Sequence, residues 1–173
     1  HTDHLQKLVY ERTEKLNKTN QELVRTAGQL RLANESLEEL ARTVPLTGLS
    51  NRRHLTETLE FHFALARRGG RPISFAMLDV DYFKHYNDTN GHPAGDEVLK
   101  SLSDLLQQRV RKTDIACRYG GEEFAIMFPD TEREQAMAVA EEVRRLVEEH
   151  NFPQEEEQPN GRLTVGVGGA AHG

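Results

Sequence analysis

The sequence predicts an α/β domain that follows a long helical stalk. A seven-residue repeat of apolar residues runs through the first 42 residues, and after it helical patterns alternate with short apolar runs typical of strands. A pair of glycines, Gly120–Gly121, separates two of these runs as a hairpin turn would. The predicted division is 1–42 for the stalk and 43–173 for the domain, in which the order is helix, strand, helix, hairpin, helix, strand.

The stalk is predicted to be a coiled coil. Its apolar residues at intervals of seven, which we call the main seam series, are Val9, Leu16, Leu23, Leu30 and Leu37. The positions four residues earlier, which we call the companion series, are Leu5, Arg12, Thr19, Thr26 and Ala33, and Leu40 continues it. A sustained repeat of seven predicts a left-handed coiled coil, most simply a parallel dimer. The alternative, a single helix lying on its own domain, would show a wider apolar stripe.

A turn, a helix and a buried strand are predicted after the stalk. Pro45 ends the stalk because proline restricts the residue before it, and Asn51 is a good N-cap for the next helix. That helix ends at a glycine pair. The run PISFAMLDVD, residues 72–81, is typical of a strand buried on both faces, and it delivers Asp79 and Asp81 at its carboxyl end.

The remaining elements follow from their apolar patterns and turn residues. After the buried strand come a short helix, a glycine-rich loop and a helix that starts at Asp96. A hairpin is predicted next, because Gly-Gly is typical of two-residue turns that need positive φ. The predicted bounds are 115–119 and 122–128 for the hairpin strands, 132–150 for a helix, 151–161 for a solvated loop and 162–171 for a last strand.

Composition disfavours several classes of partner. The formal net charge is −6, which gives no electrostatic footprint for duplex DNA or anionic lipid. No apolar run approaches the roughly 18 to 20 residues that span a bilayer, and no signal peptide is recognised. The single cysteine, Cys117, rules out an internal disulfide and fits a reducing compartment. We therefore expect a cytoplasmic segment without nucleic-acid or membrane contact. Because the chain starts without Met, we expect a fragment, and an upstream membrane tether is compatible with this.

Two acidic places stand out. Asp79 and Asp81 lie at one strand end, and Glu122 and Glu123 lie beside the hairpin turn. If the strands are neighbours, these carboxylates converge at one edge of the sheet, where oxygen ligands would suit Mg²⁺. Adjacent strand residues point to opposite faces, so a twisted turn is needed for both glutamates to approach one site. The alternative is a pair of solvated glutamates at a turn.

Three segments together resemble the GGDEF family of bacterial diguanylate cyclases, in the GGEEF variant of its signature. They are LTGLSNRR (46–53), DVDYFKHYNDTNGHPAGDEVL (79–99) and RYGGEEF (118–124), and they stand in the family's order and spacing. The resemblance implies a palm-like nucleotide-cyclase fold, with a central mixed sheet flanked by helices behind a coiled-coil stalk. It also implies a dimeric enzyme that condenses two GTP into cyclic di-GMP and releases two pyrophosphates.

The resemblance implies metal and catalytic roles for several residues. Asp79, the Val80 carbonyl and Glu122 would bind divalent ions, with Glu123 close to the second; two Mg²⁺ or Mn²⁺ ions are expected per half-site. Glu122 would also assist deprotonation of the attacking 3′-hydroxyl. Lys84 would neutralise charge on the phosphates, although a solvated helix lysine is the alternative.

Substrate-binding roles are implied in the same way. Asn87 and Asp96 would recognise guanine, since an Asp that accepts from the N1 and N2 donors rejects adenine. His92 would lie near the substrate, and Gly120 and Gly121 would let the backbone approach the phosphates. The alternatives are a helix cap for Asn87, the N-cap of the next helix for Asp96 and a plain loop residue for His92.

The segment RKTD contains Arg111 and Asp114 at the spacing of the family's inhibitory site for the cyclic di-GMP product. The alternative is an exposed ion pair between helix and strand. The chain departs from the family at Val44, where Asp is usual, which puts the coupling of stalk to domain in doubt. The family also has a further helix after the last strand, whose basic residues contact the terminal phosphates of GTP, and no such segment follows Gly173.

Two other functions remain open on the sequence alone. A non-catalytic module of the same fold would sense GTP or cyclic di-GMP through Arg111 and Asp114. A coiled-coil scaffold with an inert domain would explain the stalk but not the polar residues. The retained carboxylates Asp79, Glu122 and Glu123 favour the enzyme.

Overall fold

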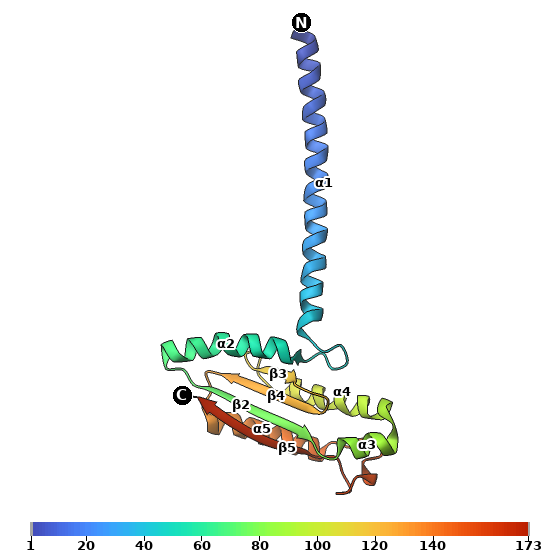
Figure 1. The fold of residues 1–173 in the computed structure, drawn as a ribbon, viewed down its shortest axis with the longest axis vertical. Coiled ribbons are helices and arrows are strands. Elements are labelled where there is room, and N and C mark those ends of the chain that lie inside the picture. Colours follow the sequence, from blue (N-terminus) through green and yellow to red (C-terminus); the bar gives the residue numbers. More distant parts are fainter. Residues whose placement is uncertain (1, 173) are drawn as a thin grey trace. The chain divides into compact units, whose positions relative to one another are not determined.

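The computed structural model describes the backbone of residues 2–172 and the side chains of 6–37 and 42–172. The chain divides into two compact units, residues 1–41 and 42–173. The first unit contains the long helix α1 (Thr2–Arg42) except for its last residue, and the second contains the sheet and the other helices (Figure 1). No helix in the described part of the chain is long and apolar enough to cross a membrane.

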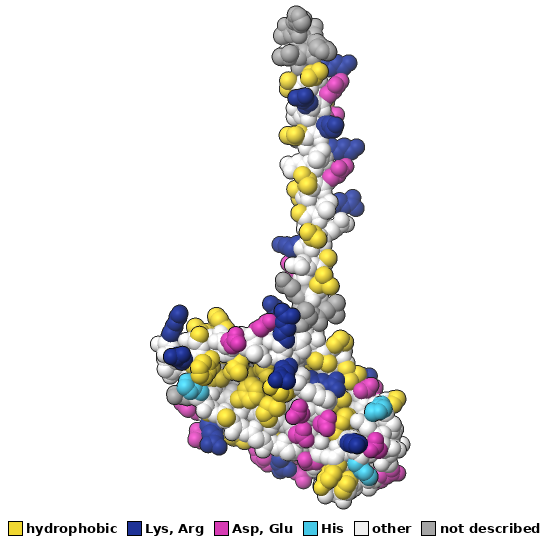
Figure 2. All heavy atoms as spheres, viewed as in Figure 1, with side chains coloured by type: hydrophobic (Ala, Val, Ile, Leu, Met, Phe, Trp, Pro, Cys, Tyr) yellow, Lys and Arg dark blue, Asp and Glu magenta, His cyan; other side chains and the backbone are white. Residues whose placement is uncertain are grey.

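Helix α1 exposes apolar side chains at regular intervals along its length (Figure 2). Every member of the main seam series is between 60% and 73% exposed. In the companion series, the hydroxyl of Thr19 donates to the Lys15 carbonyl at 2.9 Å, and that of Thr26 donates to the Glu22 carbonyl at 2.8 Å. These hydroxyls are satisfied within their own helix. The side chains of Leu5 and Leu40 lie outside the described residues.

The second unit is built on a five-stranded mixed sheet with the strand order β1–β3–β4–β2–β5 (Figure 1). Strand β1 pairs parallel with β3, and the other neighbours are antiparallel. The strands are β1 (Ser50–Asn51), β2 (Ile73–Val80), β3 (Ile115–Arg118), β4 (Glu123–Pro129) and β5 (Val165–His172). The sequence did not predict β1, because two residues are too few to show a strand pattern.

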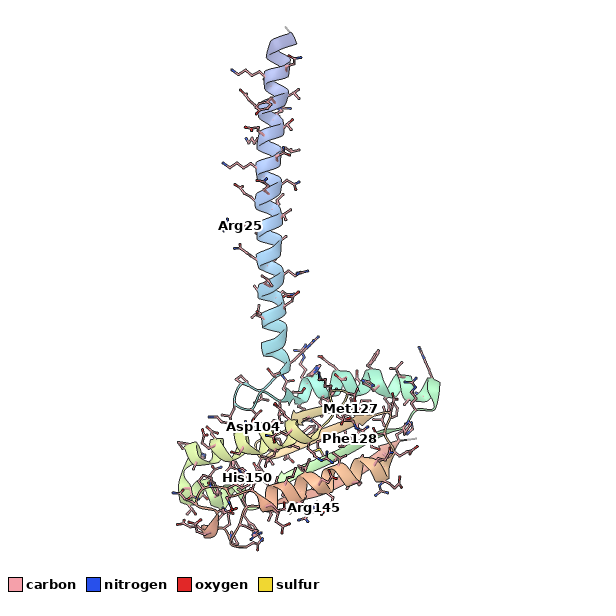
Figure 3. All side chains as sticks on the ribbon, turned by 180° about the vertical axis from the view of Figure 1, so that it is seen from behind. Arg25, Asp104, Met127, Phe128, Arg145 and His150 are labelled. Carbon is pink, nitrogen blue, oxygen red and sulfur yellow. The ribbon has the colours of Figure 1, made fainter. Side chains whose placement is uncertain are left out.

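Helices cover both faces of this sheet. The helices are α2 (Arg52–Gly69), α3 (Phe83–Asn90), α4 (His92–Arg109) and α5 (Arg133–Glu149), with a 3₁₀ helix, η1 (Glu155–Glu157). The neighbouring β4 residues Met127 and Phe128 (Figure 3) belong to different cores, the first with α2 and the second with α3, α4 and α5. Strand residues alternate between faces, so one strand serves both layers. The predicted fold class, a mixed sheet flanked by helices, is confirmed.

Local signals at α2 act as predicted. The Asn51 side chain accepts a hydrogen bond from the His54 backbone N–H at 2.9 Å, which caps the first turn. Gly70 ends the helix in the left-handed region, with φ of 60°, and its N–H donates to the Ala66 carbonyl.

Cys117 lies on β3 and is fully buried against α2. Burial raises the pKa of its thiol to about 12. The thiol is therefore protonated and inert at neutral pH.

The prediction that α4 begins at Asp96 was wrong, because the helix begins at His92. Pro93 occupies the first turn, where its missing N–H removes no helical hydrogen bond. Gly91, with φ of 85°, separates this helix from α3. The expected glycine-rich loop is thus largely helical, and Asp96 lies inside the helix one turn after His92 rather than capping it.

The two-residue hairpin was also wrong. Strand β3 ends at Arg118 and β4 begins at Glu123, so the turn spans residues 119–122. Neither central glycine has a left-handed φ. The backbone N–H groups of Tyr119 and Gly120 both donate to the Glu123 carbonyl, at 2.8 and 3.1 Å, which closes a wider turn. Glu122 consequently lies in the turn and not in the strand.

The segment 151–161 was expected to be a solvated loop, but part of it is packed. Phe152 is 4% exposed and Gln158 is 5% exposed. The hydroxyl of Tyr86 on α3 donates to the Pro153 carbonyl at 2.5 Å. This contact attaches the segment to α3, because a tyrosine whose ring is buried needs a partner for its hydroxyl.

Candidate active site

Strand pairing brings the predicted metal ligands together. In the antiparallel β2–β4 register, Asp79 lies directly opposite Glu123. The Val80 N–H donates to the Glu122 carbonyl at 3.3 Å, so the turn 119–122 lies against the end of β2. The acidic residues of the two distant sequence motifs therefore meet at one end of the sheet.

Negative charge is concentrated at this end. Partial burial raises the pKa of Asp79, and the nearby charges of Glu122, Glu123 and Asp81 raise it further. Asp79 is exposed, so water screens part of the repulsion. Among the described residues, no Lys or Arg forms an ion pair with Asp79, Glu122 or Glu123. A cation would relieve this repulsion.

The donor set fits a metal that is shared with a ligand. Within the described part of the chain, no three His, Cys, Asp or Glu side chains are gathered closely enough to hold an ion by themselves. Mg²⁺ is usually held by one or two carboxylates together with substrate phosphates. The carboxylates of Asp79 and Glu122 with the Val80 carbonyl suit such partial coordination.

Asp81 has a structural partner instead. The Thr164 hydroxyl donates to its carboxylate at 2.7 Å, and the Asp81 N–H donates to the Thr164 carbonyl at 2.9 Å. These bonds attach the end of β2 to the residue before β5. Of the two aspartates that the strand delivers, Asp79 is the one left for a cation.

A cleft of about 460 Å³ opens beside the turn, within the size range of ligand sites. Its lining residues are Phe83, Lys84, Asn87, Asp88, His92, Asp96, Leu99, Arg118, Gly121 and Glu122. Six of the predicted site residues therefore share one cavity. Asp79, Val80, Gly120 and Glu123 lie next to it through the strand register and the turn, without lining it.

Two helices present the polar wall of this cleft. Lys84 and Asn87 are three positions apart on α3, so they lie on the same face of the helix. His92 and Asp96 are separated by four on α4 and likewise share a face. The earlier start of α4 is what places His92 there, as a helical residue and not a loop residue.

The two glycines of the turn differ in their surroundings. A Cβ on Gly120 would lie 2.4 Å from Oε2 of Glu123, so Gly120 leaves space for that carboxylate. No atom lies within 4 Å of a Cβ built on Gly121, which lines the cleft. A ligand can therefore approach the backbone closely at Gly121.

Arg118 is a residue of this site to which the sequence analysis gave no role. Its Nε and Nη2 donate to the Gly121 carbonyl at 3.2 and 2.8 Å, and the side chain lines the cleft. On the other side of the turn, the Arg52 guanidinium lies 4.6 Å from the centre of the Tyr119 ring. Two residues of the turn, Tyr119 and Gly121, are thus contacted by arginines. Arg118 stands within the RYGGEEF stretch, but its contact with Gly121 depends on the shape of the turn.

Arg111 and Asp114 lie apart from this cleft, before β3. The Arg111 backbone N–H donates to the Asp114 carboxylate at 2.9 Å, which closes a local turn. Both residues line a second cavity of about 350 Å³. The Arg111 guanidinium forms no ion pair with any described residue. The alternative interpretation of this segment, an exposed ion pair between helix and strand, is therefore wrong.

Comparison with known proteins identifies relatives of this arrangement. A family profile described as "Diguanylate cyclase, GGDEF domain" matches residues 41–173. The response regulator PleD of Caulobacter vibrioides is 42% identical over 133 residues, which is 77% of this chain and 29% of PleD. The chain therefore spans less than a third of that relative.

Solved structures show the same similarity. The coiled coil and GGDEF domain of DgcB from Caulobacter crescentus, in complex with c-di-GMP, matches with a TM-score of 0.83 at 31% identity, covering 91% of this chain and 83% of that one. The active GGEEF domain of a diguanylate cyclase from Vibrio cholerae matches with a TM-score of 0.66 at 36% identity, covering 72% and 78%.

Proposed function

This chain belongs to the GGDEF family of diguanylate cyclases, and we propose that it condenses two GTP into cyclic di-GMP with release of two pyrophosphates. The observation that carries the proposal is the meeting of Asp79, Glu122 and Glu123 beside a cleft that also contains Asn87 and Asp96. Carboxylates suited to a metal-bound triphosphate and polar side chains suited to a base are the two kinds of group that a nucleoside triphosphate requires.

We assign the metal ligands to Asp79, the Val80 carbonyl and Glu122, with Glu123 near a second ion. Two divalent ions, Mg²⁺ or Mn²⁺, would stabilise the attacking and leaving oxygens of the displacement. The raised pKa of Asp79 supports this assignment, because partial burial and the nearby charges of Glu122, Glu123 and Asp81 all oppose its ionised form.

The residues of the chain would divide the remaining work. Glu122 would accept the proton of the 3′-hydroxyl, and Lys84 would offset charge that develops on the phosphates. Asn87 and Asp96 would recognise guanine, with His92 beside them. Gly121 would let the phosphates approach the turn, and Arg118 would hold its carbonyl in place.

Dimerisation is part of the proposal, since each cleft would hold one GTP and the product contains two guanosines. The exposed main seam series on α1 supports a parallel coiled coil. The internal hydrogen bonds of Thr19 and Thr26 also support it, because these side chains can enter a seam without leaving a buried hydroxyl unpaired. A dimeric coil would raise the local concentration of the partner domain to roughly the millimolar range.

We also propose that the cavity at Arg111 and Asp114 binds the cyclic di-GMP product and inhibits the enzyme. The Arg111 guanidinium supports this, because it forms no ion pair with any described residue and can bind phosphate or a guanine edge through two bonds. The same cavity would serve a non-catalytic sensor, the alternative function.

The test is incubation of the full chain with GTP and Mg²⁺, followed by chromatography of the nucleotides. We expect cyclic di-GMP and pyrophosphate, and no product when EDTA removes the metal. Binding of GTP or cyclic di-GMP without turnover would favour the sensor. No binding and no turnover would overturn both.

A further inference from the structure

Gly95 is a buried residue in the first turns of α4. A Cβ at this position would lie 1.9 Å from Oδ1 and 2.9 Å from Cγ of Asn87, and 3.1 Å from Cζ of Phe83. Separations below 3.0 Å are not tolerated by a real Cβ. The carboxamide of Asn87 therefore occupies the space that any other residue at position 95 would fill.

The backbone does not explain the glycine. Gly95 is helical and does not adopt a left-handed φ. Alanine is the better helix former at such a position, so a glycine here lowers helix stability for no local benefit. The reason must come from the neighbouring side chain.

We propose that Gly95 is a positioning residue for base recognition, because its missing side chain lets the Asn87 carboxamide lie in the wall of the cleft. This inference rests on the proposed function, in which Asn87 contacts guanine. It deepens that function by naming what determines the orientation of the base-recognising group.

Packing, not hydrogen bonding, places this carboxamide. The Oδ1 atom of Asn87 is buried and has no hydrogen-bond partner among the described residues. With no such bond to hold Oδ1, the position of the carboxamide depends on packing, and the space that a Cβ on Gly95 would fill is where it lies. A methyl group at position 95 would push the carboxamide away at the end of a flexible side chain, so the fold should survive.

Asp96 should be affected little by the same change. It follows Gly95 on α4, and the helix need not move if the Asn87 side chain yields. The expected defect is therefore limited to the contact between Asn87 and the base. The proposed metal ligands Asp79 and Glu122 should not be affected.

The experiment compares Gly95→Ala, Asn87→Ala and the double variant in the full chain. Binding is measured by calorimetry with α,β-methylene GTP and with α,β-methylene ATP. In both analogues a methylene group replaces the oxygen between the α- and β-phosphates, so the bond that breaks in the reaction cannot break. We expect Gly95→Ala to weaken GTP-analogue binding roughly tenfold, as loss of a base hydrogen bond would, and to leave the weak ATP-analogue binding unchanged. The KM for GTP should rise by the same factor, with kcat within about twofold.

The double variant separates positioning from general damage. If Gly95 acts through Asn87, Gly95→Ala should cause no further loss when Asn87 is already alanine. The matched control is Gly69→Ala on α2, where a Cβ would make an ordinary contact of 3.7 Å with Arg71 and binding should not change.

Several results would overturn the inference. If Gly95→Ala binds the GTP analogue as tightly as the wild type, Gly95 does not act through Asn87. The same follows if the double variant loses affinity by the product of the two single losses. Loss of the fold in both Gly95→Ala and the double variant would assign Gly95 to packing against Phe83 instead. If the wild type itself neither binds the GTP analogue nor forms product, the proposed function fails, and this inference fails with it.

Discussion

Glu122 has two proposed duties, since its carboxylate would hold a metal ion and accept a proton. Replacing it with glutamine keeps the shape but removes the charge and the proton acceptor. We expect Glu122→Gln to lower the rate of cyclic di-GMP formation at least about 100-fold, with a thermal midpoint close to that of the wild type because the residue lies in a turn. The control is Glu60→Gln at an exposed position on α2. A rate for Glu122→Gln near the wild-type value would refute the assigned metal site.

Arg118 should affect catalysis through the two parallel N–H groups of its guanidinium, which fix the shape of the turn 119–122. Its two N–H groups hold the Gly121 carbonyl, so Arg118→Ala should lower kcat roughly tenfold by loosening the turn, and lower stability by about 1 kcal/mol. Arg118→Lys keeps the charge but not the two parallel bonds. If turn geometry matters, steady-state kinetics of the lysine variant will match those of the alanine variant; full rescue by lysine would indicate a charge effect instead.

The charge of Asp79 should destabilise the metal-free protein. Its folded-state pKa is raised, so the ionised carboxylate opposes folding at neutral pH, and the penalty fades as pH falls through that pKa. We expect Asp79→Asn to stabilise the metal-free chain at pH 7 by roughly 0.5 kcal/mol, a small value because the group is exposed. Thermal unfolding with EDTA at pH 7 and pH 4 tests this. The two proteins should converge at the lower pH, and added Mg²⁺ should stabilise the wild type more.

The sequence revealed some of these residues and concealed others for a physical reason. Carboxylates at the end of an apolar strand interrupt a pattern, so Asp79 and Glu122 were visible as candidates. Gly95 and Arg118 act through contacts with Asn87 and Gly121, and only the packed helices and the closed turn define those contacts. The pattern of residue types along the sequence does not predict these contacts.

At the level of elements, the start of α4 and the length of the hairpin turn were predicted wrongly. In both cases the residues used for the prediction are common in two kinds of local structure. Proline and glycine are typical of loops, but proline also fits the first turn of a helix, which is where Pro93 lies. A glycine pair is typical of a two-residue turn, yet here it lies in a four-residue turn closed by backbone bonds to Glu123. The choice in each case depends on neighbouring elements. Helix α2, whose start and stop signals were unambiguous, was predicted closely.

The seam of α1 can be weakened or strengthened by substitution. Replacing Leu23 and Leu30 with glutamine should give monomers whose specific activity rises steeply with protein concentration. Arg12 would place two positive charges across the seam of a parallel dimer, so Arg12→Leu should tighten the dimer and keep specific activity constant to lower concentration. Light scattering and activity over a dilution series measure both effects.

A matched control for the seam is Leu32→Gln, which changes an exposed leucine outside both series. It should leave mass and activity unchanged. If the Leu23 and Leu30 variant stays fully active when dilute and monomeric, α1 is not the dimerising element and the requirement for two facing clefts fails.

For the whole molecule, the order of the elements predicted the fold class, but the order of the strands in the sheet was not predicted. Periodicity shows that a strand is buried and says nothing about its neighbours. The β2–β4 pairing that joins Asp79 to Glu123 was therefore an assumption until the sheet was seen. The packed segment around Phe152 was missed because its composition is polar, although it is attached to α3.

Strand β3 links the two cavities, since its first residues line the cavity at Arg111 and Asp114, and the turn 119–122 follows its end. A substitution in the cavity at Arg111 should nevertheless change product inhibition without changing the catalytic rate. We expect Arg111→Ala to keep the initial rate within about twofold and to weaken inhibition by added cyclic di-GMP at least about tenfold, because the guanidinium would bind phosphate or guanine through two bonds. Initial-rate assays with added product test this, with Arg133→Ala at an exposed site on α5 as control. Absence of product inhibition in the wild type would contradict the assignment.

The burial of Cys117 makes the chain convenient for site-directed chemistry. It is the only cysteine, it is fully buried, and its thiol remains protonated at neutral pH. Thiol reagents should therefore leave the native protein unlabelled, and any cysteine introduced on the surface will be the sole reactive one. Cysteines placed one at a time at Thr19 and Thr26 would both form disulfides with their own copies only where two helices run parallel and in register, because an antiparallel pair can bring no more than one of these positions next to its copy. The orientation of paired stalks thus becomes readable from a non-reducing gel.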